Sequence, residues 1–252
     1  MTASLTPERL ARVIAETWPP ERVETIGPFA MAHGGGGGNR VSAARLLNAG
    51  ASGSEVSRDE IDSVAAAQRA LGQEALFMVL GHQTGLDGLL EAEGYTTRDE
   101  TVALTVAAAD LAAPPPRVTC FDIWPPLAVQ EEIWAQGGIG PARLAIMNRV
   151  TGPKTSLFGR IGDRPAGSAF IAIEDGVAML HALEVAPRAR RQGLAAHMMR
   201  AVAHWAEAQG AEIFAVLVTR KNSPALGLYT SLGMNPVGKY YYRVKLGETA
   251  QK

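Results

Sequence analysis

A basic turn followed by an expected helix holds the residues in this sequence that are best suited to binding an anion. The turn spans Arg188 to Ala195, between a strand expected to end at Val185 and an amphipathic helix expected from Gly193 to Gln209. The first N–H groups of a helix have no partners within it, and the positive end of its dipole attracts anions. Gly193 has no side chain to block a ligand. Positive charge comes from three arginines, Arg188, Arg190 and Arg191. The turn therefore predicts a diphosphate site; the alternative is an exposed basic helix start that binds nothing.

A second segment lies downstream of this turn. Asn222 to Met234 reads Asn-Ser-Pro-Ala-Leu-Gly-Leu-Tyr-Thr-Ser-Leu-Gly-Met. In order and spacing, Arg190-x-x-Gly193-x-Ala195 and this segment resemble the acyl-CoA pyrophosphate loop and the Asn-x-x-Ala-x-x-x-Tyr helix of the GNAT superfamily of N-acyltransferases. The resemblance covers roughly residues 155–245. More loosely, the first half of the chain resembles the degenerate module of tandem GNAT proteins.

The resemblance implies an N-acetyltransferase that moves an acetyl group from acetyl-CoA to a primary amine of a small molecule, directly, within a ternary complex. The backbone of Leu183 and Val185 would pair with the pantetheine amides, and Asn222 and Ala225 would line the pantetheine arm. Tyr229 matches the tyrosine that protonates the departing thiolate in many members; the alternative is an aromatic that only packs its helix. The backbone amides implied to cradle the pyrophosphate are those of Arg190, Arg191, Gln192, Gly193, Leu194 and Ala195.

Such a reaction needs a neutral amine. A lysine-like amine is only about one part in 2,500 neutral at pH 7, so a base, acting through water, would help. Strand alternation places Glu184 on one face with Leu180 and Ala182, and His181 on the opposite face. Glu184 is the leading candidate if the ligand groove lies on its face, and His181 if it lies on the other. Either residue could instead be buried and satisfied, with water alone serving as the base.

Strands mixed with helices predict an α/β (α+β) protein. Ala113 to Pro116 contains three consecutive prolines, which cannot continue a helix or an interior strand. We therefore expect two domains, 1–113 and 114–252, each a mixed, mostly antiparallel twisted sheet flanked by helices. Helices are expected at 7–18, 58–71, 85–93, 126–136, 141–149, 193–209 and 223–232, and strands at 29–33, 40–47, 75–80, 101–107, 155–161, 166–173, 177–185, 212–219 and 239–246.

The two halves look like copies of one unit. An offset of 139 residues, the distance from Gly94 to Gly233, places three elements on matching elements without a gap. The alternative is that apolar strands match at this offset by chance, but an internal repeat should be tested first.

At this offset the first copy lacks the proposed chemistry. Tyr229 corresponds to Leu90, and Glu55 stands where phosphate would bind, since Arg190 to Ala195 corresponds to Ala51 to Val56. Likewise Glu184 matches Arg45, and Asn222 matches Gln83. We expect the first copy to cover the acceptor side of the second instead of binding CoA.

Five consecutive glycines, Gly34 to Gly38, suggest a phosphate loop, but no Lys-Ser/Thr follows and Asn39 to Val41 is expected to lead into a strand. A plain mobile loop is the simpler interpretation, and a flap over the acceptor site is another. Phe121 to Trp134 contains two tryptophans and two glutamates that would suit a cationic amine, although the glutamates could form a solvated helix face.

Composition narrows the class of protein. The 252 residues are 47% hydrophobic and 19% charged, with 24 Lys+Arg against 25 Asp+Glu, which favours a globular fold and argues against nucleic acid as a partner. One cysteine, Cys120, and five scattered histidines predict no metal site. The sequence shows no signal peptide pattern and no apolar run of membrane-spanning length, so we expect a cytoplasmic monomer or homodimer that does not bind membranes.

Two other functions stay open at this point. The protein could be an acyl-CoA-binding sensor without catalytic activity. It could also bind a nucleotide through the glycine run.

Overall fold

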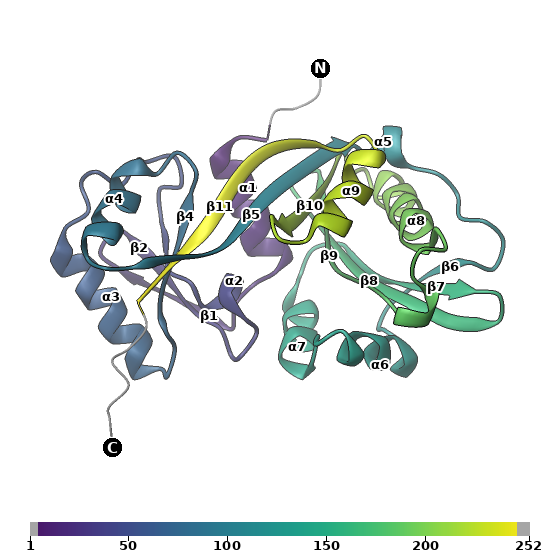
Figure 1. The fold of residues 1–252 in the computed structure, drawn as a ribbon, viewed down its shortest axis with the longest axis horizontal. Helices are drawn as coiled ribbons and strands as arrows, with labels where there is room; N and C mark the ends of the chain where they lie inside the picture. Colours follow the sequence, from purple (N-terminus) through teal and green to yellow (C-terminus); the bar gives the residue numbers. More distant parts are fainter. Residues whose placement is uncertain (1–4, 246–252) are drawn as a thin grey trace.

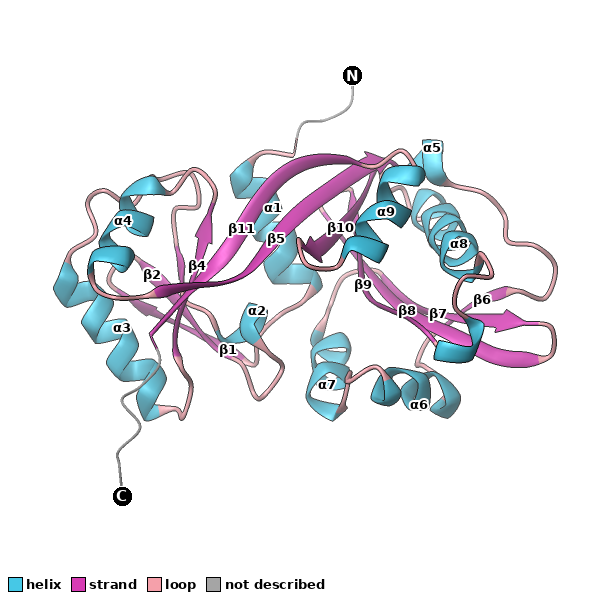
Figure 2. Ribbon diagram, viewed as in Figure 1, coloured by secondary structure: helices cyan, strands magenta, loops and turns pink. Residues whose placement is uncertain are grey.

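The computed structural model describes residues 5–245, which form two β-sheets covered by helices (Figures 1 and 2). The helices are α1 (Pro7–Thr17), α2 (Asn39–Ser42), α3 (Arg58–Ala70), α4 (Thr84–Ala92), α5 (Ala108–Leu111), α6 (Ala128–Gln136), α7 (Pro141–Arg149), η1 (Pro187–Ala189), α8 (Leu194–Ala208) and α9 (Ser223–Ser231). The strands are β1 (Arg22–Ile26), β2 (Phe29–His33), β3 (Arg45–Leu46), β4 (Ala75–Leu80), β5 (Thr96–Ala107), β6 (Cys120–Ile123), β7 (Lys154–Ile161), β8 (Arg164–Glu174), β9 (Val177–Val185), β10 (Ile213–Thr219) and β11 (Asn235–Lys245). The predicted mixed, mostly antiparallel architecture is confirmed.

The larger sheet joins the two halves of the chain by a reciprocal exchange of strands. Its order is β4-β11-β5-β10-β9-β8-β7-β6. Strand β5 follows α4 in the first half but pairs with β10 of the second half, whereas β11 follows α9 in the second half but pairs with β4 of the first. The exchanged strands also pair with each other, antiparallel, and form the long central ribbon in Figure 1. Both strands therefore cross the division expected at residue 113.

The 139-residue offset relates the elements on each side of this exchange. It carries α4 (Thr84–Ala92) onto α9 (Ser223–Ser231), and it carries β5 onto β11 within one residue at the end. The same offset also aligns most of the residues of α3 with residues of α8. The same order of helix and strand thus occurs twice, and each copy donates its last strand to the other.

The segment 40–47 differs from expectation. It was expected to be a strand, but residues 39–42 form the single turn α2, and only Arg45 and Leu46 form a strand. The side chains of Gln68 and Gln73 donate to the carbonyl of Ser42, at 3.1 and 3.4 Å, so distant side chains satisfy backbone that would otherwise need a strand partner. The sequence also did not reveal β1, β6 and α5, which are short, and β1 contains no buried residue.

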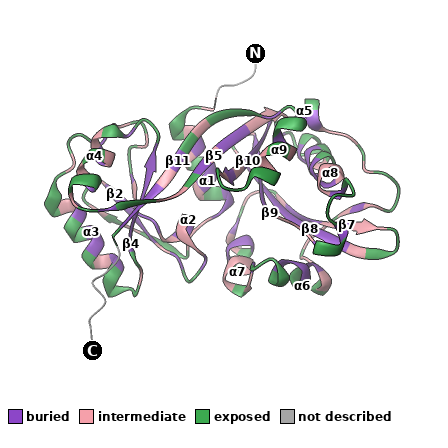
Figure 3. Ribbon diagram, viewed as in Figure 1, coloured by how far each residue is buried: buried purple, intermediate pink, exposed green. Residues whose placement is uncertain are grey.

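Helices cover both faces of the sheet around β8 and β9 (Figure 3). On one face, α8 buries Leu194, Met198 and Val202 in a core shared with Ala169 and Leu180. On the other face, α6 and α7 bury Trp134 and Ile146 against Phe170 and Ala172. Side chains of β9 are therefore assigned to a face by the helix they contact.

Candidate functional site

Strands β9 and β10 begin as a parallel pair and then separate. Their pairing covers Val177–Leu180 with Ile213–Val216 and no later residues, although both strands continue for several positions. The last residues of β9, including Leu183 and Val185, therefore have no strand partner on the β10 side. The GNAT resemblance implies that the backbone of these two residues pairs with the pantetheine amides, and this gap leaves space beside them.

A β-bulge at Ala182 corrects the expected orientation of Glu184. Ala182 has a φ of 51°, and the pairing of β9 with β8 shifts so that Phe170 faces His181 while Ser168 faces Glu184. Phe170 and Ser168 are two residues apart in β8 and share a face, so His181 and Glu184 share one as well. The expectation that they lie on opposite faces is wrong, because the bulge interrupts the alternation. Both belong to the face covered by α6 and α7.

Trp134 fixes this bulge from α6. Its indole Nε1–H donates to the carbonyl of Ala182 at 2.7 Å, and its side chain is fully buried. The tryptophan expected to line an acceptor pocket instead supports β9. Glu131 and Glu132 are exposed and form the solvated face of α6.

We expect Trp134→Phe to lower the free energy of unfolding by about 2–4 kcal/mol, because the variant leaves a buried carbonyl without its donor and a space beside it. Urea denaturation measures this loss. Trp205→Phe, on the half-buried part of α8, is the matched control and should cost less. Equal losses in the two variants would contradict the role given to the hydrogen bond.

The basic turn has the backbone expected of an anion-binding loop. After η1, Arg191 and Gly193 adopt left-handed conformations with φ of 63° and 81°, and α8 begins at Leu194 with no side chain capping its N-terminus. The turn borders a cavity of about 210 Å³, here called the loop hollow, which is also lined by Val185 and Leu228. Its remaining lining residues are Ala189, Arg190, Arg191, Gly193, Leu194, Ala195 and Ala196. The structure thus brings the predicted loop beside the open end of β9; Gln192 lies in the turn and donates to the carbonyl of Arg188 at 3.1 Å.

Arg190 connects the loop to the predicted base. Its guanidinium lies 3.0 Å from a carboxylate oxygen of Glu184, and its Nε–H donates to the carbonyl of Val185 at 3.0 Å. The second bond occupies a backbone group implied to pair with pantetheine. Arg190 is largely exposed, so solvent screens this ion pair and little holds the side chain in place.

Helix α9 carries the other predicted residues. The side chain of Asn222 accepts a hydrogen bond from the N–H of Ala225 at 3.2 Å, which caps the helix. Tyr229 is 8% exposed and lies in the core shared with α8, next to Leu228 of the loop hollow. Burial raises the pKa of Tyr229 to about 12. Its hydroxyl therefore stays protonated at neutral pH, as a proton donor must.

His181, the alternative base, is buried and fully engaged. Nδ1 accepts from the guanidinium of Arg40 at 3.1 Å, because a guanidinium can only donate. Nε2 must then carry the proton, and this N–H donates to the hydroxyl oxygen of Thr17 at 3.0 Å. Burial, and next the charge of Arg40, hold the pKa of His181 well below 6.5. His181 is therefore neutral and serves to orient Arg40.

The lowered pKa of His181 predicts a loss of stability in mild acid. Below pH 6.5 the unfolded chain takes up a proton at this residue and the folded chain does not, so the free energy of unfolding falls by up to about 1.4 kcal/mol per pH unit until the lower folded pKa is reached. We expect this contribution to be missing in His181→Gln. Urea denaturation of both proteins at pH 7.5 and 5.5 measures the difference; identical pH dependence would contradict it.

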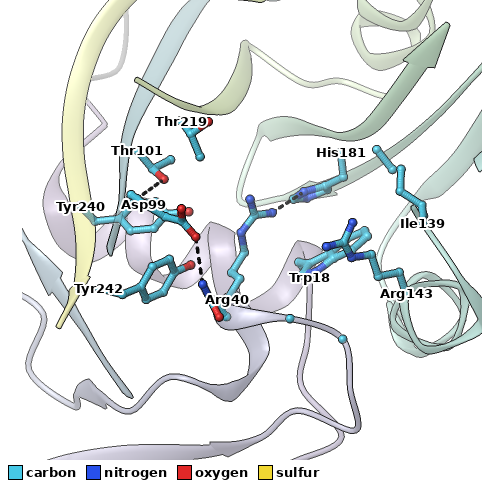
Figure 4. A pocket seen from close by; sticks show the side chains of 14 residues that line it. Trp18, Arg40, Asp99, Thr101, Ile139, Arg143, His181, Thr219, Tyr240 and Tyr242 are labelled. Atoms are coloured by element: carbon cyan, nitrogen blue, oxygen red, sulfur yellow. Dashed lines mark hydrogen bonds between the residues drawn. The ribbon is translucent and has the colours of Figure 1, made fainter. Parts of the chain in front are cut away.

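A second cavity, of about 280 Å³, lies between the two halves of the chain (Figure 4). It meets the gap at His181 and Ala182 of β9 and Thr219 of β10. Its charged lining residues are Arg40, Asp99 and Arg143. The rest of the lining is Trp18, Gly37, Gly38, Asn39, Thr101, Ile139, Tyr240 and Tyr242. None of these three charged residues stood out in the sequence, because the strand exchange and the fold bring them together from well-separated positions, with Arg40 and Arg143 on different halves of the chain.

The glycine run forms one wall of this cavity. It makes a turn closed by a hydrogen bond from Gly37 to Gly34 at 2.9 Å, and Gln73 accepts from the Gly34 N–H at 2.8 Å. A Cβ on Gly37 would lie 2.5 Å from the end of the Ile146 side chain of α7, so a larger residue here would displace that side chain. The run forms a hydrogen-bonded turn, and it leads into α2 instead of the strand expected.

The first half contains a counterpart of the loop hollow. A cavity of about 580 Å³ is bordered by residues 51–56, which the offset relates to 190–195. Glu55 and Glu60 line it, and the offset places Ala51 and Ser52 where the second half has Arg190 and Arg191. The charge of the two glutamates opposes a diphosphate, in keeping with the expectation that the first copy does not bind CoA.

Known proteins share the second half of this arrangement. Residues 117–234 match the model of the acetyltransferase (GNAT) family. This part of the chain is a GNAT domain. The uncharacterised N-acetyltransferase YobR of Bacillus subtilis is 28% identical over 95 residues, which cover 37% of this chain and 38% of that protein. The matched stretch thus spans well under half of the length of this curated relative.

Solved structures extend the fold likeness beyond the GNAT domain. A GCN5-related N-acetyltransferase from Kribbella flavida has a TM-score of 0.72 at 19% identity and covers 97% of both chains. A tandem GNAT protein from the clavulanic acid biosynthesis pathway has a TM-score of 0.60 at 13% identity and covers 96% of this chain and 89% of its own. At such identities the likeness concerns the fold. It includes the first half, outside the family match.

Two kinds of feature are missing from the described part of the chain. Within residues 5–245, no three or more His, Cys, Asp or Glu side chains lie together as a metal ion would need. The helices described here are also all too short or too polar to cross a membrane.

Proposed function

We propose that the GNAT domain transfers an acetyl group from acetyl-CoA to the primary amine of a small molecule, directly, within a ternary complex. One observation carries the proposal: two cavities meet the same short stretch of β9. The loop hollow reaches Val185, and the cavity between the halves reaches His181 and Ala182. An acyl donor held at the loop and an acceptor held between the halves would therefore approach each other where β9 and β10 separate.

The donor would be held mostly by backbone groups. The N–H groups at the start of α8, with Arg190 and Arg191, suit the pyrophosphate. The carbonyl of Val185, now engaged by Arg190, suits a pantetheine amide. Binding would then exchange one partner of Arg190 for another, moving its guanidinium from Glu184 towards phosphate oxygens.

The chemical step forms a C–N bond and breaks a C–S bond. The neutral amine attacks the thioester carbonyl, the tetrahedral intermediate collapses, and the thiolate takes a proton from Tyr229. The pKa of about 12 keeps that proton on Tyr229 in the resting site, and the thiolate takes it as the C–S bond breaks; the proton released by the amine then returns to the tyrosinate through water.

Removal of the amine proton is assigned to Glu184, acting through water. It lies on the same face of β9 as the acceptor cavity, and release from Arg190 would leave its carboxylate free to accept. His181 does not suit this task, because its Nδ1 lone pair is bound by Arg40 and protonation beside that charge is unfavourable.

The first half would cover the acceptor. Arg40 and Asp99 reach the acceptor cavity from that half, and the glycine run packs against α7 to close one side. Measuring thiol release from acetyl-CoA with a panel of amines tests the proposal. Acceptor-dependent release is expected; tight CoA binding without it would indicate an acyl-CoA sensor instead.

A further inference from the structure

The cavity between the halves contains two arginines without acidic partners. Among residues 5–245, neither Arg40 nor Arg143 forms an ion pair within 4.0 Å. Arg40 comes from α2 in the first half and Arg143 from α7 in the second. Both line the same cavity, so two positive charges from opposite walls face one small space (Figure 4).

Arg40 is held in place before any ligand arrives. Its guanidinium donates to Nδ1 of His181, which in turn bonds to Thr17, and the His181 ring stacks on Trp18 with centroids 4.8 Å apart. Its Nε–H, however, is buried and has no acceptor in the part of the chain described. A buried donor without an acceptor costs free energy that an anionic ligand would recover.

Asp99 provides a charge of the opposite sign in the same cavity. A bulge of β5 turns it inward, with a φ of 51°, and Asn39 donates to its Oδ2 at 3.0 Å. It forms no ion pair within 4.0 Å with Arg40 or Arg143. Two residues along β5, Thr101 pairs with Thr219 at the end of β10, so Asp99 lies near the gap where the thioester would be attacked. A cationic amine drawn to Asp99 would be placed beside that gap.

We propose that the acceptor carries a carboxylate as well as its amine, in the manner of an amino acid. Arg40 and Arg143 bind the carboxylate, and Asp99 attracts the amine. The inference rests on the proposed function and names its substrate class. A volume of about 280 Å³ is large enough for one such molecule. Trp18, Ile139 and Tyr240 leave an apolar surface for its side chain.

Matched acceptors test the carboxylate directly. The full chain is assayed for thiol release with phenylalanine, phenylalaninamide and phenethylamine, and with the same three forms of leucine and methionine. We expect at least one carboxylate member to exceed its amide and its decarboxylated amine by about 10- to 100-fold in kcat/KM. Amides or plain amines turned over equally well would overturn the inference and leave acetyl transfer intact. A preference for aminoalkyl phosphates would overturn the carboxylate assignment.

Variants then assign the preference to the arginines. Arg143→Gln should reduce the carboxylate preference by about 10-fold or more, whereas Arg69→Gln, on the exposed part of α3, should retain it. Arg40→Lys is the second variant, and Arg143→Gln still decides if that one fails to fold. An unchanged preference in Arg143→Gln would overturn the inference.

Binding separates this inference from the proposed function. If acetyl-CoA binds but no amine releases thiol, acetyl transfer is refuted. The same acids and amides are then compared by thermal shift: a rise in Tm with the acid alone, lost in Arg143→Gln, supports the carboxylate site, and its absence overturns it.

Discussion

Replacing Gly193 by Glu is expected to raise the KM for acetyl-CoA by more than about 100-fold, equivalent to about 2.7 kcal/mol of lost binding. Gly193 precedes the first turn of α8 with a φ of 81°, and its surroundings leave room for a side chain, since a Cβ there would lie 3.8 Å from the nearest atom of His197. The new carboxylate would therefore fit. It would occupy the space beside the first N–H groups of α8, Arg190 and Arg191, where the pyrophosphate is proposed to bind. Its charge would repel the phosphates.

The fold should tolerate this change. An acidic residue at a helix N-terminus is favoured by the dipole, which offsets part of the cost of about 1–2 kcal/mol for a left-handed non-glycine residue. Gly210→Glu is the matched control: Gly210 has a φ of 83° at the other end of the same helix and open space around it. The control should lose more stability, because the dipole disfavours an acidic residue at this end of the helix, and yet keep its KM for acetyl-CoA.

Steady-state kinetics at varied acetyl-CoA, with calorimetric binding of CoA, measure both variants. A Gly193→Glu protein that binds acetyl-CoA as the natural protein does would show that the loop is an exposed helix start without this ligand.

Removing the hydroxyl in Tyr229→Phe is expected to lower kcat by about 10²- to 10⁴-fold with little change in the KM for acetyl-CoA. The ring remains to fill the core beside α8, so the fold should be unaffected. Tyr95→Phe is the matched control, since burial also raises the pKa of Tyr95 to about 12 and this residue packs in the core of the first half. Its kcat should be unchanged.

The raised pKa of Tyr229 adds a second measurement. A tyrosine that ionises near pH 10 when unfolded and about 12 when folded contributes stability that is fully present below pH 10 and is lost between pH 10 and 12. Tyr229→Phe should lack this loss. An unchanged kcat in Tyr229→Phe would show that Tyr229 only packs its helix and that water protonates the thiolate.

Local signals in the sequence were enough for most elements. Residues 75–80 and 141–149 form a strand and a helix with the expected ends, because an apolar run and an N-terminal proline define them within a few residues. The turn before α8 and the helix of Tyr229 were predicted for the same reason. These features depend on neighbours in the chain.

Features that depend on distant contacts could not be predicted. The orientation of Glu184 was wrong because Trp134, 48 residues before the bulge, holds Ala182. Arg40 was missed because its partner His181 lies 141 residues away. The cavity between the halves needs α2, α7, β5, β9, β10 and β11 together, and no single window of sequence contains them.

The exchange of β5 and β11 has a consequence for how this chain can be divided. Each half lacks one of its own strands and borrows the equivalent strand from the other, so cutting the chain near residue 113 would leave β4 with an unpaired edge where β11 now lies. Unpaired edges of this kind invite aggregation. Since each half completes its sheet with a strand of the other, we expect either half expressed alone to fold poorly.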